Sequence, residues 1–260
     1  MDNLNFSNGY SEVNGISMYY EMYGNGKPLV LIHGGGSTIQ ISFGKIIPQL
    51  AQSRQIIAMD LEAHGRTNSR STPLAFEQDA DDVAQLLHNL GIGKADFLGF
   101  SNGGNTVVEI ALRHPQLIGK LILCSSLYKR SGTFPQFWEG FDHASFDQLP
   151  QPFKEEFLRV NNNPDALLNM FNKDVARMKA FQDWTDGQLA SIQAPAYIIN
   201  GTQDVATPEH AVAMYRLFPN GELTILPSNH GEYIGQMDPQ AGESALPGMT
   251  IGLIERFLDK

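Results

Sequence analysis

Short apolar runs alternate with helical segments along most of this 260-residue chain. Between the runs, apolar residues recur at helical spacing, as at Phe76, Ala80 and Val83. Strands that alternate with helices pair in parallel and carry helices on both faces of the sheet. We therefore predict an α/β fold with a mostly parallel, twisted sheet of about eight strands. The later strand-like runs lie at 28–32, 55–59, 95–99, 120–125, 196–201 and 222–226.

The N-terminal segment adds a predicted β-hairpin to this sheet. Asn14 and Gly15 separate two strand-like runs, 10–13 and 16–23. An Asn-Gly pair is a preferred two-residue hairpin turn because both residues tolerate positive φ. A glycine cluster at 24–26 then precedes the apolar run 28–32, which is typical of a strand buried on both faces.

The interval 129–187 interrupts the alternation because it contains no convincing strand. It holds 8 of the 15 phenylalanines and both tryptophans of the chain. A structureless loop of this length is unusual in a compact domain, so we expect a helical insertion after the sixth strand. We predict a core domain of residues 1–128 and 188–260 and a helical cap of residues 129–187. Most of the aromatic residues should form the cap's own core, and some should face a pocket beneath it.

The segment from Gly99 to Gly103 matches the pattern G-x-S-x-G, with Ser101 at its centre. A strand-like run precedes it and a helix-like run, 102–114, follows it. In this context the serine occupies a sharp strand-to-helix turn that projects its hydroxyl above the sheet, at the positive end of the helix. Side chains at the two glycines would collide across such a turn. Ser101 is therefore the candidate nucleophile.

A serine hydroxyl needs a base, and seven histidines compete for this role. His33 and His64 follow strands but precede the serine. His230 follows the last strand in a loop, at the strand edge where open α/β sheets bind ligands. Asp204, just beyond the run 196–201, is the candidate acid that orients the imidazole, because the other suitable position, at 125–129, carries no acid.

A tetrahedral oxyanion needs preorganised N–H donors. The N–H of Asn102, the residue after the nucleophile, is one candidate. The second is expected from the glycine-rich loop after the strand 28–32, where backbone can approach a substrate closely, and we select Gly35.

Composition indicates which classes of molecule the protein is expected to bind and where in the cell it is expected to be found. A net charge of −10 and a pI of about 5.1 disfavour nucleic-acid binding. No apolar run reaches the length of a membrane span, and no secretory signal is recognisable at residues 1–10, which predicts a cytoplasmic location. The single cysteine, Cys124, lies in an apolar run and is expected to be a buried thiol. We expect a small-molecule substrate, no cofactor and no metal.

Together these residues resemble the α/β hydrolase fold superfamily, from about Tyr10 to Leu258. The order Ser101, Asp204, His230 is similar to the family order of nucleophile, acid and base, and the insertion stands where the family places its cap. The segment from Asp60 to Thr67 resembles the family pattern D-x-R-G-x-G-x-S but departs from it at Glu62, Ala63 and Thr67.

The resemblance is to small serine hydrolases of this superfamily: carboxylesterases, enol-lactonases and carbon–carbon bond hydrolases. It implies hydrolysis of a carboxylic ester of a small, largely apolar substrate through an acyl-enzyme. Cleavage of a lactone or a carbon–carbon bond by the same triad, acyl transfer to an alcohol, and a ligand receptor with slow turnover are the alternatives, because this fold hosts many functions.

Overall fold

The computed structural model describes residues 6–237 and 244–260, and its centre is one eight-stranded sheet. The strand order is β1-β2-β4-β3-β5-β6-β7-β8. The pairs β1–β2 and β2–β4 are antiparallel and the remaining pairs are parallel, which confirms the predicted sheet. The strands are β1 (Phe6–Val13), β2 (Ile16–Tyr23), β3 (Lys27–Ile32), β4 (Arg54–Met59), β5 (Ala95–Phe100), β6 (Ile118–Cys124), β7 (Ala196–Gln203) and β8 (Gly221–Asn229).

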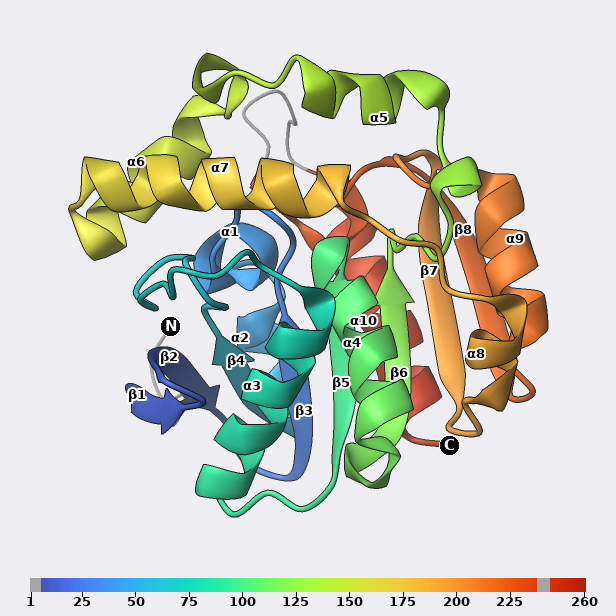
Figure 1. Cartoon of the computed structure of the whole chain (residues 1–260). Helices are drawn as coiled ribbons and strands as arrows, with labels where there is room; N and C mark the ends of the chain where they lie inside the picture. Colours follow the sequence, from blue (N-terminus) through green and yellow to red (C-terminus); the bar gives the residue numbers. More distant parts are fainter. Residues whose placement is uncertain (1–5, 238–243) are drawn as a thin grey trace.

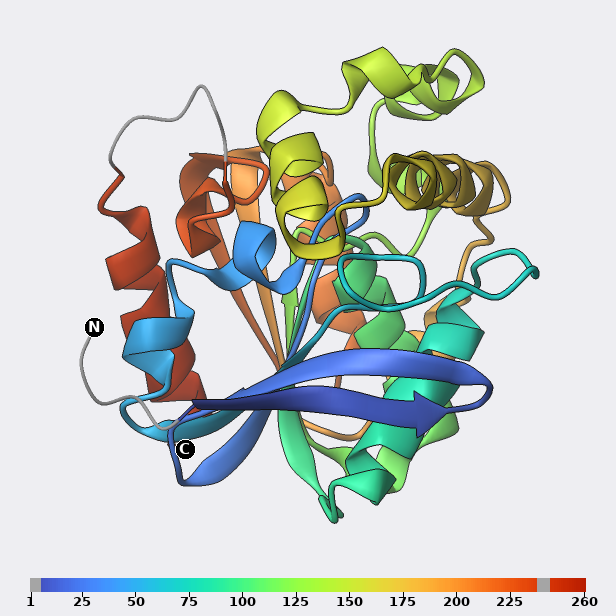
Figure 2. The ribbon, with the colours of Figure 1, turned by 90° about the vertical axis from the view of Figure 1, so that its left-hand side faces the viewer.

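Helices cover both faces of the sheet (Figures 1 and 2). In Figure 2, α1, α2 and α10 lie on one side of the sheet, whereas α3 and α4 lie on the other. The α-helices are α1 (Ile39–Phe43), α2 (Ile47–Leu50), α3 (Phe76–Asn89), α4 (Asn102–Arg113), α5 (Pro135–Asp142), α6 (Gln151–Asn161), α7 (Pro164–Lys179), α8 (Asp186–Ser191), α9 (Pro208–Leu217) and α10 (Leu246–Leu258). Short 3₁₀ turns are η1 (Pro115–Leu117), η2 (Arg130–Gly132), η3 (Phe146–Gln148) and η4 (Glu232–Ile234). None of these helices is long and apolar enough to cross a membrane.

The central strands are apolar throughout because both of their faces are buried. Successive side chains of a strand point to opposite faces. Accordingly, Val30 and Ile32 of β3 pack with the residues of α3 and α4, whereas Leu29 and Leu31 pack with those of α1 and α10. All four side chains are at most 1% exposed, so a polar substitution on either face would leave an unsatisfied group in a core.

The predicted hairpin is confirmed, with Val13 paired to Ile16 across a two-residue turn. Asn14 and Gly15 have φ values of 44° and 88°, the positive values that a type I′ turn requires.

The connections from β3 and β5 leave a crevice at the carboxyl edge of the sheet. From β3 the chain crosses to β4 on one side, whereas β5 lies on the other side of β3. Adjacent strands whose following connections diverge in this way form a topological switch point, where open α/β sheets bind ligands. The loop after β3 and the turn after β5 are therefore the segments that the fold places at this crevice.

The insertion after β6 is helical, as the sequence predicts. It carries α5, α6, α7 and α8, and in Figure 1 α5, α6 and α7 lie across the carboxyl end of the sheet. Proline occupies the start of α5, α6 and α7, where its missing N–H has no intrahelical acceptor to lose. The division into a core of 1–128 and 188–260 and a cap of 129–187 stays a prediction.

Helix α4 packs very closely against the sheet at the turn that begins it. A Cβ atom at Gly103 would collide with the backbone carbonyls of Ile32 and His33, and one at Gly99 would collide with the backbone of Gly103. The predicted collision across the turn is therefore present, and glycine is required at both positions by close approach.

Gly103→Ala is expected to lower the free energy of unfolding by about 2 kcal/mol or more, because the new methyl group would push α4 away from β3. Urea denaturation followed by circular dichroism measures the change. Gly252→Ala in α10 is the matched control. Its Cβ meets nothing within 4 Å, so it should gain about 0.5 to 1 kcal/mol from helix propensity. Equal stability of Gly103→Ala and wild type would contradict the packing argument.

Candidate active site

Ser101 occupies the turn between β5 and α4 in a strained backbone conformation. Its φ is 53° and its ψ is −123°, a region that non-glycine residues rarely adopt and that costs of order 1–3 kcal/mol. Ser101 stands at the N-cap position of α4, yet its side chain makes no capping hydrogen bond. The hydroxyl is therefore not occupied as a helix cap, and it lies at the positive end of the helix.

His230 and Asp204 come together from the ends of two neighbouring strands. Asp204 follows β7 and His230 follows β8, and the distance from His230 Nδ1 to Asp204 Oδ1 is 2.6 Å. The imidazole also lies against the ring of Phe100, with centroids 4.8 Å apart. Because Nδ1 is engaged by the carboxylate, Nε2 is the nitrogen left for proton transfer.

The carboxylate of Asp204 has several further donors. Ser125 Oγ donates to Oδ2 at 2.5 Å, the Gly201 N–H donates to Oδ2 at 3.0 Å, and the Val205 N–H donates to Oδ1 at 2.7 Å. Burial raises the pKa of Asp204, but the hydrogen bond and charge of His230 and the bond from Ser125 outweigh burial and lower it overall. Asp204 is thus held ionised.

Ser125 and Tyr233 support Asp204 in a way that the sequence reasoning missed. Ser125 has a φ of 51° and lies 2.7 Å from the hydroxyl of Tyr233, which donates to the Ile199 carbonyl at 3.0 Å. The position of Ser125, directly after β6, was the signal in the sequence. The end of β6 is the second position at the carboxyl edge of the sheet that could carry the acid. In this chain it carries Ser125 instead, whose hydroxyl donates to Asp204.

The two expected oxyanion donors lie beside Ser101. Gly35 and Asn102 line the same cavity as the serine. The Asn102 N–H belongs to the first turn of α4, whose N–H groups lack intrahelical acceptors. In the part of the chain that the structure describes, the Gly35 N–H has no hydrogen-bond acceptor, whereas the Gly36 N–H donates to Asp174 Oδ2 at 2.5 Å.

The cavity over Ser101 has a volume of about 220 Å³ and mostly apolar walls. Among the described residues, Asp174 and His230 are its ionisable lining groups, and no lysine or arginine lines it. Several aromatic residues of the insertion face the cavity, as the sequence predicts for part of them. The apolar lining consists of Phe137, Phe141, Leu149, Phe171, Val175, Met178 and Val205.

His33 and His64, the competing histidines, are both fully buried below this cavity. His33 Nδ1 donates to the Gly34 carbonyl at 2.7 Å, and His33 Nε2 accepts from the Leu61 N–H at 3.0 Å, an arrangement that requires a neutral ring. Burial, aided by the charge of His64, lowers the pKa of His33 to about 3. His33 is therefore a neutral support for the start of the glycine loop.

His64 contacts a residue that the sequence reasoning did not single out. Its Nε2 lies 2.9 Å from Asp174 Oδ2, although Asp174 belongs to the insertion and is 110 positions away in the chain. No local pattern marks a single acid in an amphipathic helix as part of a site, so sequence alone offered no signal for Asp174 beyond its place in the cap.

Residues 27–234 match the family model described as alpha/beta hydrolase fold. The chain is 35% identical to 2-hydroxymuconate semialdehyde hydrolase from Pseudomonas sp. (strain CF600), over 71% of this chain and 73% of that protein. A solved structure of a serine hydrolase involved in carbazole degradation, the CarC enzyme, superposes with a TM-score of 0.79 at 20% identity, covering 98% of this chain and 99% of that one.

Some matches are partial. The chain is 39% identical to the uncharacterized hydrolase YugF of Bacillus subtilis (strain 168), over 46% of this chain and 45% of that protein. It also spans 62% of the dihydrolipoyllysine-residue acetyltransferase component of the acetoin cleaving system of Pseudomonas putida. The chain thus covers less than two thirds of the length of these two relatives.

The buried neutral His33 predicts a loss of stability on acidification. Its pKa is lowered in the folded state, so its contribution is complete above the unfolded-state pKa of about 6.5 and is lost as the pH falls toward about 3. Below pH 6.5, this residue should make the free energy of unfolding fall by about 1.4 kcal/mol for each unit by which the pH is lowered. Urea denaturation of wild type and His33→Gln at several pH values measures it.

In His33→Gln, the free energy of unfolding should depend less steeply on pH than in wild type. The difference in slope should be up to about 1.4 kcal/mol per pH unit, which corresponds to one proton. His88→Gln removes an exposed histidine on α3 and should keep the wild-type slope. Identical slopes for all three proteins would show that His33 is not held neutral by burial.

Proposed function

We propose that this chain, which belongs to the α/β hydrolase fold family, is a serine hydrolase that cleaves carboxylic esters with a small, uncharged, apolar acyl group. The observation that carries the proposal is the shared cavity. Ser101, His230 and the candidate oxyanion donors all line one apolar pocket of about 220 Å³. Such a pocket buries an acyl chain while the polar groups converge on its carbonyl.

The residues have distinct roles in the proposed reaction. Ser101 Oγ attacks the ester carbonyl while His230 Nε2 accepts its proton, and Asp204 stabilises the imidazolium through Nδ1. The N–H groups of Gly35 and Asn102 bind the oxyanion. His230 then protonates the leaving alcohol, and a water molecule, activated by the same histidine, releases the acid from Ser101.

The charge of the pocket favours an ester over a carbon–carbon bond hydrolysis substrate that carries a carboxylate. A carboxylate substrate calls for a cation at the pocket wall. The described lining holds the carboxylate of Asp174 and no lysine or arginine. The guanidinium of Arg177 is paired with Asp174 at 2.5 Å and with Asp79 at 2.8 Å, so it is committed to protein carboxylates. Lactones without a free carboxylate remain the second candidate substrate class.

A fluorophosphonate probe is expected to label Ser101 and no other serine. Ser101 and His230 line the same cavity, and the strained turn leaves the serine hydroxyl free of a capping hydrogen bond. Peptide mass spectrometry identifies the labelled residue. Ser101→Ala should lose labelling and should lower kcat by about 10⁴-fold or more.

Ser126→Ala, at the same edge of the sheet, is the control and should still be labelled. Its serine follows β6 and donates to the Cys124 carbonyl. Labelling that persists in Ser101→Ala would refute the nucleophile assignment.

The volume of the pocket predicts a limited dependence on acyl length. With p-nitrophenyl esters, each added methylene that becomes buried contributes up to about 0.8 kcal/mol, or roughly fourfold in kcat/KM. The increase should hold over the first few carbons and stop when the walls formed by Phe141 and Phe171 are reached. Steady-state kinetics with acetate, butyrate, hexanoate and longer esters measure it.

A cationic choline ester tests the opposite idea, that Asp174 attracts positive substrates. We expect no preference for it over a neutral ester of equal length, because the negative charge of Asp174 is already paired with His64 and Arg177. A strong preference for the choline ester, with no gain from acetate to hexanoate, would overturn the apolar-pocket proposal.

A further inference from the structure

Asp174 of α7 brings a buried carboxylate from the cap to the edge of the active-site cavity. The side chain is 11% exposed, and three donors from different parts of the fold converge on it. Oδ2 accepts from the Gly36 N–H at 2.5 Å and from His64 Nε2 at 2.9 Å, and Oδ1 accepts from Arg177 at 2.5 Å. One carboxylate thus joins the cap to the loop that carries the candidate oxyanion donor.

The surroundings hold this carboxylate ionised. His64 Nδ1 lies 2.8 Å from the Glu62 carbonyl, so both ring nitrogens face acceptors and the ring is an imidazolium. Burial lowers the pKa of His64, but the charge of Asp174 and its hydrogen bond to the ring together outweigh burial and raise the pKa. Burial likewise raises the pKa of Asp174, but His64 and Arg177 outweigh it and hold the pKa well below its usual range.

The loop that receives this contact needs external restraint. Three consecutive glycines, Gly34 to Gly36, lack side chains that would limit their backbone, and Gly36 has a φ of 63°. The first glycine is held by His33 and by Ser42, whose Oγ accepts from the Gly34 N–H at 3.4 Å. The Gly36 N–H belongs to the peptide that follows Gly35, so its bond to Asp174 fixes the other end of the loop.

We propose that Asp174 is a positioning residue that sets the oxyanion loop, residues 33–36, from the cap. It holds the Gly35–Gly36 peptide so that the Gly35 N–H points into the cavity beside Ser101. The oxyanion site is then complete only while α7 is docked on the core. This inference rests on the proposed function, because it assigns Asp174 a part in stabilising the tetrahedral intermediate of that reaction.

Asp174→Asn separates this role from cap docking. The side-chain amide has nearly the same shape as the carboxylate, and its oxygen can still accept from Arg177. Its NH₂ group can donate to His64 Nε2 once that ring is neutral, while His64 Nδ1 still donates to the Glu62 carbonyl. The cap contacts therefore persist, and the Gly36 N–H alone loses its acceptor.

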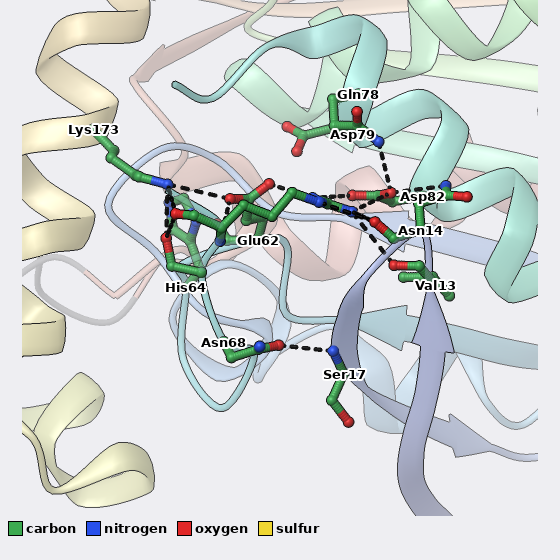
Figure 3. Close-up of polar contacts among 12 residues, drawn as sticks. Val13, Asn14, Ser17, Glu62, His64, Asn68, Gln78, Asp79, Asp82 and Lys173 are labelled. Carbon is green, nitrogen blue, oxygen red and sulfur yellow. Dashed lines mark hydrogen bonds and ion pairs between the residues drawn. The ribbon is translucent and has the colours of Figure 1, made fainter. Parts of the chain in front are cut away.

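Lys173→Met is the matched control on the same helix. Lys173 Nζ reaches from α7 to Glu62 Oε1 at 3.2 Å, to Ser69 Oγ at 2.7 Å and to the Arg70 carbonyl at 2.6 Å. Figure 3 shows Lys173 reaching from the helix toward Glu62, in a network that continues to Asp82 and Asn14. This substitution removes one set of contacts between α7 and the core, while the contacts of Asp174 that keep α7 at the oxyanion loop stay in place.

The experiment compares kcat, KM and inhibitor affinity in wild type, Asp174→Asn and Lys173→Met. Ser101 Oγ adds to the carbonyl carbon of a trifluoromethyl ketone, and the proton of the serine passes to His230. The resulting oxyanion occupies the oxyanion site. The matching methyl ketone binds without this addition. For Asp174→Asn we expect kcat to fall about 10- to 100-fold with KM changed less than about threefold. The affinity for the trifluoromethyl ketone should fall in proportion to kcat/KM, while that for the methyl ketone stays constant.

Lys173→Met should stay within about threefold of wild type in all four quantities, because it leaves the Gly36 contact intact. If the two variants lose activity equally, or if Asp174→Asn keeps the wild-type affinity for the trifluoromethyl ketone, the positioning role is refuted. If wild type neither hydrolyses esters nor reacts with the fluorophosphonate at Ser101, the proposed function fails instead.

A measurement on the wild-type protein covers the case in which Asp174→Asn does not fold. In protein labelled with ¹⁵N-glycine, the Gly36 amide proton should resonate downfield and exchange slowly, because it donates to an ionised, buried carboxylate. Fast exchange of this amide in the folded protein would refute the contact on which the inference rests.

Discussion

The close packing of α4 on the sheet is the constraint on which the rest of the site depends. Gly103 allows the first turn of α4 to lie directly against the end of β3. Gly99, in β5, has no side chain that would collide with the backbone of Gly103 in that turn. This close approach accompanies the positive φ of Ser101 and brings the residue next to the loop after β3, where a Cβ atom at Gly34 would lie 3.3 Å from the Ser101 Cβ. The strain at Ser101 costs about 1–3 kcal/mol. It persists because the packing of α4 in the core stabilises the fold by far more than this cost.

Around that fixed turn, the polar groups of the site are held by partners from distant segments. Asp204 is oriented by Ser125 from the end of β6, and the glycine loop is held by His33 from below and by Asp174 from above. Each of these contacts places a charged or polar group where water is excluded, so each must be satisfied within the protein. These partners restrain the glycine loop at both ends, as the proposed oxyanion site requires.

The segment from Asp60 to Thr67 shows how a departure from a family pattern is accommodated. Ala63 stands where the pattern has glycine, yet it keeps a φ of 66°, a conformation that costs an alanine of order 1 kcal/mol. Glu62 stands where the pattern has arginine and pairs with Arg70 and with Lys173 of the cap. His64 of the same segment contacts Asp174 of the cap, so Glu62 and His64 both connect this loop to α7.

The sequence by itself determined the alternation of strands and helices, the hairpin, the helical insertion, the turn at Ser101 and the placement of Asp204 and His230 at strand ends. These features are local, because periodicity, glycine spacing and position after a strand are all read along the chain. Only the tertiary structure decided that Asp174 meets Gly36, which is 138 positions away, and that Ser125 donates to Asp204, which is 79 positions away. The direction in which an inserted helix crosses the sheet depends on the packing of whole elements, and no local pattern of residues encodes which of its side chains will face the site.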